Sequence, residues 1–125
     1  MLTRMLLVLT LMGAVLWPLS GRAEDRPVRI AFIGSMTGAR ATVGRDALDG
    51  LTLAFDQFAG RPGGAETELV DFDDKMTSQT ALQVMDKQIA DGVRLFIAAP
   101  ANPDILPAMV ARAAQARAFI LAVSP

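Results

Sequence analysis

The chain of 125 residues contains no cysteine and no histidine. Without cysteine it can form no disulfide, no thiolate metal site and no lipid anchor on a cysteine that follows a signal sequence. Without histidine it can form no histidine-based catalytic triad, no imidazole-ligated zinc site and no histidine general base. We therefore expect this protein to use neither a metal nor a cofactor.

The chain also lacks an excess of positive charge. Its 12 basic residues nearly balance its 13 acidic residues, so it has no basic field to attract nucleic acid. Its glycine-containing loop, GSMTGARATVGR, has neither the G-x-x-x-x-G-K-[ST] spacing of a phosphate loop nor the G-x-G-x-x-G spacing of a dinucleotide site. No G-x-S-x-G nucleophile elbow is present. These absences argue against a nucleic-acid partner, a nucleotide site and a serine hydrolase.

Asp73 and Asp74 form an adjacent pair of carboxylates just beyond a predicted strand. Such a pair could serve a metal site or an acid–base site. Neighbouring residues on a strand point to opposite faces, however, so the two side chains need not converge. We expect the pair to lie in a solvated loop or to cap the following helix, and we predict no catalytic residue in the chain.

The first 23 residues have the organisation of a secretory signal peptide. Arg4 supplies a positive start, residues 5–17 are almost entirely apolar, Pro18 breaks this run, and Ala23 stands at the predicted cleavage site. A membrane anchor is the alternative, but the run is shorter than the roughly 20 residues that a membrane span needs. We therefore predict cleavage after Ala23, a periplasmic location and no stable membrane insertion of the cleaved chain.

The remaining chain, residues 24–125, alternates between strand and helix patterns. Its opening run VRIAFIG is apolar, rich in β-branched residues and ended by glycine, as in a strand buried on both faces of a parallel sheet. The order predicts an α/β fold, a partial doubly wound parallel sheet of β-α-β-α-β-α-β with right-handed crossovers. The predicted strands cover residues 28–34, 66–72, 93–99 and 118–123, and the predicted helices cover residues 47–58, 77–90 and 102–113.

A ligand site in such a sheet is expected beyond the carboxyl ends of the strands, where the strand order reverses. With the order 2-1-3-4, that point lies between the first and third strands, and two loops face it. Both loops lead into helix N-termini, whose free N–H groups attract a carboxylate. The candidate ligand-binding residues are Ser35, Thr37 and Gly38 in the first loop and Ala99, Ala101 and Asn102 in the second. The alternative is structural: Asn102 could be a plain helix cap, and the hydroxyls could satisfy loop backbone groups.

The segment VRIAFIGSMTGARATVGRDALDGLTLAFDQF resembles the opening of type I periplasmic binding proteins of the branched-chain amino-acid class. Members of that family begin with a strand, an M-T-G-like loop, a glycine and an A-x-x-G-x-x-L-A helix, followed by a glycine pair and a strand that ends in two aspartates. The residues that carry the resemblance are Met36-Thr37-Gly38, Gly44, Ala47, Gly50, Leu53-Ala54, Gly63-Gly64, Val70 to Asp74 and Ala81 to Ile89.

The resemblance implies that residues 24–125 form the first half of one lobe of a leucine-binding-protein-like domain. It also implies a function as the periplasmic solute receptor of an ABC importer. Such a receptor binds an amino acid, or a related small carboxylate or amide, between two lobes that close by a hinge motion. Its partners would be that ligand and an ABC permease in the inner membrane. The resemblance does not imply an enzyme.

The chain departs from the family pattern in two respects. The loop after the third strand usually carries serine or threonine, but here it reads Ala99-Pro100-Ala101-Asn102, and proline has no N–H to donate. The chain is also much shorter than the family, so we expect a truncated receptor. Two alternatives stay open: a non-transport ligand sensor or non-functional truncated product, and a fragment of an exported α/β enzyme.

Overall fold

A computed structural model describes residues 26–123 of the chain. The predicted signal peptide, residues 1–23, and its cleavage after Ala23 lie outside the described residues and stay predictions. None of the helices in the described part of the chain is long and apolar enough to cross a membrane.

The four strands form one parallel sheet in the order β2-β1-β3-β4. They are β1 (Val28–Gly34), β2 (Thr67–Asp73), β3 (Leu95–Ala99) and β4 (Phe119–Ala122). The predicted α/β class, the parallel direction and the strand order are therefore confirmed. The order reverses between β1 and β3, because the chain adds β2 on one side of β1 and then crosses over to add β3 and β4 on the other.

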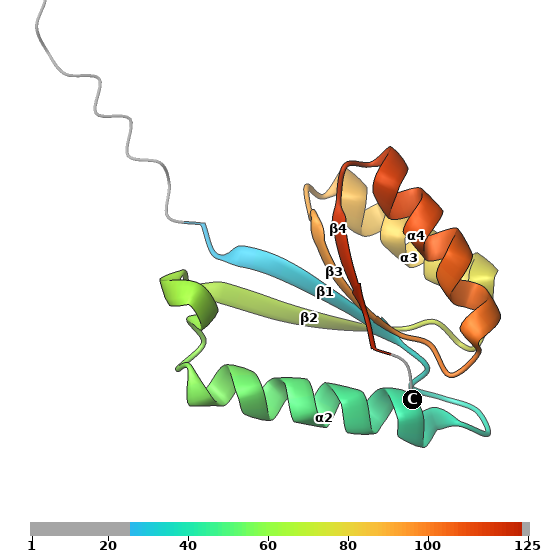
Figure 1. The fold of residues 1–125 in the computed structure, drawn as a ribbon, viewed down its shortest axis with the longest axis horizontal. Helices are drawn as coiled ribbons and strands as arrows, with labels where there is room; N and C mark the ends of the chain where they lie inside the picture. Colours follow the sequence, from blue (N-terminus) through green and yellow to red (C-terminus); the bar gives the residue numbers. More distant parts are fainter. Residues whose placement is uncertain (1–25, 124–125) are drawn as a thin grey trace, which may run out of the picture.

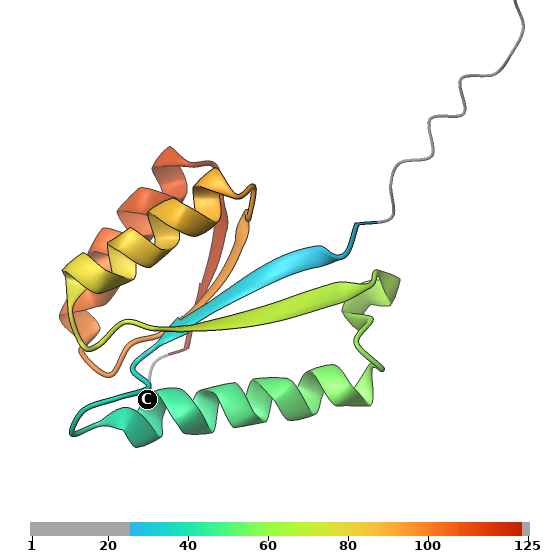
Figure 2. The ribbon, with the colours of Figure 1, turned by 180° about the vertical axis from the view of Figure 1, so that it is seen from behind.

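The helices cover both faces of the sheet, as a doubly wound fold requires. Helix α2 (Ala41–Gln57) lies along one face, and α3 (Ser78–Ala90) and α4 (Leu106–Gln115) lie side by side on the other (Figures 1 and 2). Two short 3-10 turns complete the order, η1 (Pro62–Gly64) before β2 and η2 (Pro103–Ile105) before α4.

Alternating residues of the central strands supply the two halves of the core. On β1, Ala31 and Ile33 face α3 and α4, whereas Phe32 faces α2 and packs near Ala47, Leu48 and Leu51. Phe32 is 1% exposed, and full burial of a side chain of this size contributes about 2–3 kcal/mol. Since both faces of β1 are covered, its apolar run from Ile30 to Ile33 is explained.

Helix α2 begins six residues earlier than its predicted start at residue 47, so the prediction of a loop through Gly44 is wrong there. Thr42 and Val43 are β-branched and Gly44 is flexible, which makes this turn a poor helix by propensity. Tertiary packing overrides that weakness. The last predicted helix also differs, because residues Pro103–Ile105 form a separate 3-10 turn before α4.

The α2 side of β4 is more open than the rest of the sheet. Phe119 is 63% exposed and Leu121 is 50% exposed, although both lie on a strand that pairs with β3. Within the described residues, β3 is the one strand that pairs with β4. The best-packed part of the sheet is therefore around β1 and β3, and the candidate site lies at the ends of these two strands.

Candidate functional site

Three loops meet at the carboxyl ends of β1, β2 and β3. They are residues 35–40 after β1, residues 74–77 after β2 and residues 100–102 after β3. Backbone hydrogen bonds join the loop starts to the neighbouring strands, from Asp74 N to Gly34 O at 3.0 Å and from Ser35 N to Ala99 O at 3.4 Å. The predicted crevice loops thus lie next to each other, with the aspartate loop beside them.

Ser35 ties the three loops together through one hydroxyl. Its Oγ donates to Asp74 Oδ1 at 2.8 Å and accepts from the Ala101 N–H at 2.9 Å. The side chain has no exposed surface. Ser35 was predicted to orient a ligand directly, but in this structure its hydrogen bonds are made inside the protein.

Asp74 is fully buried, which contradicts the prediction of a solvated position for the aspartate pair. Besides the Ser35 hydroxyl, its Oδ1 accepts the Met76 N–H at 2.7 Å. Its Oδ2 is buried and has no hydrogen-bond partner among the described residues. Asp74 does not cap α3 either, since the cap is Thr77, whose hydroxyl accepts the Thr80 N–H at 3.2 Å.

Asp73 holds the exposed part of the loop after β1 against the loop after β2. Its Oδ1 accepts the N–H groups of Met36 and Lys75, each at 2.9 Å, and its Oδ2 accepts the Thr37 hydroxyl. Partial burial alone would raise the pKa of Asp73, but the hydrogen bonds from Thr37, Lys75 and Met36 favour the charged form, and the net effect is a lowered pKa. The aspartate pair is therefore a structural clamp on the loop after β1.

Thr37 and Gly38 are the exposed members of the first candidate loop. Thr37 donates its hydroxyl proton to Asp73, so its oxygen can still accept a hydrogen bond from outside. Gly38 has φ +90°, and a Cβ there would lie 3.1 Å from Met76 Sδ. Glycine is needed at this position because a side chain would suffer both backbone strain and crowding.

The second candidate loop is mostly buried. Ala99 and Ala101 have almost no exposed surface, and the Ala101 N–H is already donated to Ser35. Asn102 is partly exposed, and its Oδ1 accepts the Asp104 N–H at 3.1 Å, so it caps the turn η2. The predicted capping role of Asn102 is confirmed, and its side-chain NH₂ remains a donor.

Gly44 and Arg45 complete the loop after β1 from helix α2. A Cβ at Gly44 would lie 2.7 Å from the Ser35 carbonyl carbon and 2.8 Å from its nitrogen, so α2 starts in direct contact with this loop. The next residue, Arg45, donates from Nε to Met36 O at 3.0 Å. Sequence reasoning missed Arg45, and no local pattern marks it, because the contact depends on the early start of α2.

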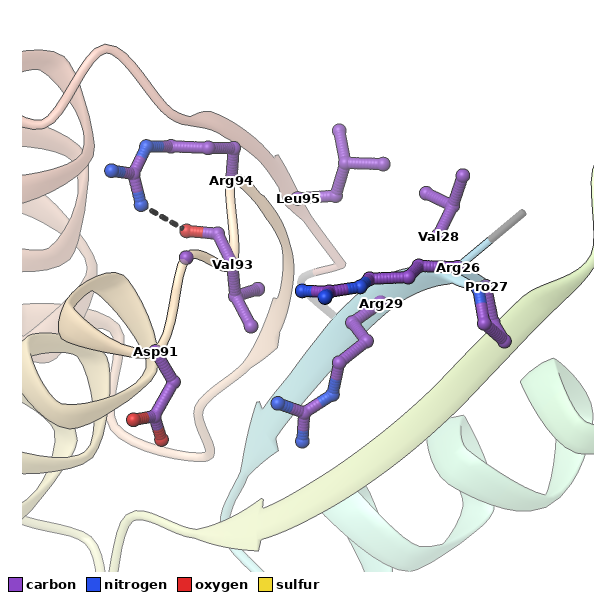
Figure 3. A pocket seen from close by; sticks show the side chains of 9 residues that line it. Arg26, Pro27, Val28, Arg29, Asp91, Val93, Arg94 and Leu95 are labelled. Atoms are coloured by element: carbon purple, nitrogen blue, oxygen red, sulfur yellow. Dashed lines mark hydrogen bonds between the residues drawn. The ribbon is translucent and has the colours of Figure 1, made fainter. Parts of the chain in front are cut away.

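A pocket of about 570 Å³ lies at the opposite end of the sheet, before the starts of β1 and β3 (Figure 3). Its lining includes three arginines, but Arg29 pairs with Glu68 at 2.9 Å and Arg94 donates to the carbonyls of Ile89 and Val93. Figure 3 shows the Arg94 side chain extending away from Arg26 and Arg29. Among residues 26–123, no group of three or more acidic residues could hold a metal ion.

The fold defines a class of protein: an α/β lobe whose loops after β1 and β3 meet where the strand order reverses, the position at which open α/β domains bind ligands. The chain belongs to the periplasmic binding protein family, whose model matches residues 27–124. No curated protein matches the chain at a significant level.

Solved structures of transport receptors share this lobe. The branched-chain amino-acid transporter substrate-binding protein LivJ from Streptococcus pneumoniae, in complex with isoleucine, is 26% identical with a TM-score of 0.70, over 79% of this chain and 29% of that chain. An ABC transporter substrate-binding protein from Sphaerobacter thermophilus is 27% identical with a TM-score of 0.70, over 78% and 26%. A solute-binding protein from R. palustris in complex with benzoate shares the fold at 20% identity and a TM-score of 0.71, over 78% and 27%.

The chain thus spans less than a third of the length of each of these three structures.

Proposed function

We propose that this chain is part of a periplasmic solute receptor that delivers a small ligand to an ABC permease in the inner membrane. The observation that carries the proposal is the family match over residues 27–124, together with crevice loops built at the ends of β1 and β3. The predicted signal peptide, residues 1–23, supports export to the periplasm. Residues 24–125 would then be the opening part of the receptor domain.

The ligand we propose is a small carboxylate, such as an amino acid or an aromatic acid. Two similar structures, the LivJ protein and the R. palustris protein, hold isoleucine and benzoate, and these molecules share a carboxylate. The rest of these two molecules differs widely, so the carboxylate is the group that receptors of this fold could recognise in both. An amide of similar shape is the neutral alternative that the experiments below distinguish.

Thr37, Gly38 and Asn102 are the residues we propose for direct ligand contact. They are the exposed or partly exposed members of the candidate set, and each belongs to a loop at the predicted crevice. Ser35, Ala99 and Ala101 contribute indirectly, since their buried contacts fix the path of both loops. A ligand that meets this lobe would therefore meet a rigid surface rather than one that must first be ordered.

Calorimetric titration of the full-length protein tests this function. We expect saturable binding of isoleucine or benzoate and no heat of binding with glucose as the control solute. Thr37→Val and Asn102→Ala should weaken the binding, and each lost hydrogen bond corresponds to about a two- to tenfold change in Kd. Absence of binding to every acid tested would refute the proposal.

A further inference from the structure

The crevice loops have few donors left for an acid group. The Ser35 hydroxyl is donated to Asp74, the Ala101 N–H to Ser35, and the Met36 N–H to Asp73. Pro100 has no N–H at all. The Asn102 side-chain NH₂ remains a donor, but a carboxylate needs several donors when it leaves water, so a charged donor beside these loops would strengthen their hold on the acid end of a ligand.

Arg45 is placed to be that donor. Its Nε hydrogen bond to Met36 O, at 3.0 Å, holds the guanidinium beside the loop that carries Thr37. Within residues 26–123 the guanidinium has no other hydrogen bond or ion pair, and the residue is exposed. An arginine anchored through Nε keeps both terminal nitrogens for a planar, two-pronged contact with a carboxylate.

The start of helix α2 beside Arg45 also favours an anion, although Asp46 and Asp49 follow Arg45 on the same helix. Helix α2 has no acidic residue in its first turn and no side-chain cap at its start. The N-terminus of a helix carries partial positive charge, so the cations Arg40 and Arg45 near it do not stabilise the helix. An anionic group bound there would offset the partial positive charge of the helix N-terminus and the charge of the two arginines, whereas a neutral group would not.

We infer that Arg45 is the residue that recognises the carboxylate of the ligand, in place of hydroxyl groups in the loop after β3. Gly44 makes this possible, because the absence of a side chain lets α2 pack on Ser35 and brings the next residue to Met36. The inference rests on the proposed receptor function and adds the group that selects acids over their neutral analogues.

The test compares acids with their amides in the full-length protein. The probes are benzoate with benzamide, and isoleucine with isoleucinamide, measured by calorimetric titration. Arg45→Gln removes the charge but keeps a polar side chain. The matched control is Arg61→Gln, since Arg61 is also exposed and donates to a backbone carbonyl, that of Gly64, in the loop before β2.

We expect the unmodified protein to bind at least one acid more tightly than its amide. Arg45→Gln should weaken acid binding by about ten- to a hundredfold, leave amide binding nearly unchanged, and so abolish the preference. Arg61→Gln should keep the preference for the acid. This result would distinguish a direct contact of Arg45 with the ligand from a general effect of net charge.

Three results would overturn the inference. Equal losses for acid and amide in Arg45→Gln would mean that Arg45 only shapes the loop. An unchanged acid preference in Arg45→Gln would place the selecting group elsewhere, with the receptor function intact. If none of the four probes binds to the unmodified protein, the carboxylate receptor function fails, and the role of Arg45 fails with it.

Discussion

Replacement of Ser35 by alanine should destabilise this lobe more than its small change in volume suggests. The substitution leaves the buried Ala101 N–H without its partner and removes one donor from buried Asp74. An unsatisfied buried polar group costs about 1–3 kcal/mol, and a lost hydrogen bond to a carboxyl group about as much, so we expect a total of about 2–6 kcal/mol. Stabilities of domains are about 5–15 kcal/mol, so this loss is large.

Urea denaturation measures the loss in free energy of unfolding, and amide hydrogen exchange locates it. Exchange should accelerate most at Ala101, and Thr37→Ala is the matched control. It also deletes a hydroxyl that donates to an aspartate, but at an exposed site, where we expect about 0.5–1.5 kcal/mol. The reasoning is refuted if Ser35→Ala costs no more than Thr37→Ala, or if the Ala101 amide keeps its original exchange rate.

Two further predictions concern the same loops. Gly44→Ala should lower the thermal midpoint, because its methyl group would collide with the Ser35 backbone at a cost of about 1–3 kcal/mol, whereas Gly50→Ala in the same helix meets no atom within 4 Å and should be neutral or stabilising. The lowered pKa of Asp73 stabilises the fold above the ordinary aspartate pKa, and this contribution is lost as the pH falls through the lower folded pKa. Asp73→Asn should therefore make unfolding less dependent on pH below about pH 4, measured by denaturation against pH, and an unchanged acid slope would contradict this.

The sheet could be predicted from sequence because its signal is local and redundant. The strand Val28–Gly34 is apolar from Ile30 to Ile33, where both of its faces are covered, and the predicted strand boundaries match within about two residues. The alternation of strands and helices then allows few topologies, because crossovers in parallel sheets are right-handed. The observed order β2-β1-β3-β4 is one that these rules allow, and the crevice stays a prediction at the point where this order reverses.

The start of α2 and the environment of Asp74 could not be predicted in this way. The first turn of α2 has weak helix formers and is stabilised by the fit of Gly44 against Ser35, which is a contact between two elements. An aspartate that follows a strand is ordinarily solvated, and Asp74 can be buried because the Ser35 hydroxyl and the Met76 N–H both donate to its Oδ1. Both features depend on partners that lie far from them in the sequence.

Asp73 and Asp74 explain why some candidate ligand-binding residues hold the loop and others remain exposed. Asp74 and Asp73 take up the donors of Ser35, Met36 and Thr37, so the residues that look most suited to grip an acid are committed to holding the loop. A rigid loop improves the placement of a ligand contact but cannot itself neutralise a negative charge. This division is why we assign charge recognition to Arg45, whose guanidinium lies outside this hydrogen-bond network and is anchored to the loop after β1 through Nε.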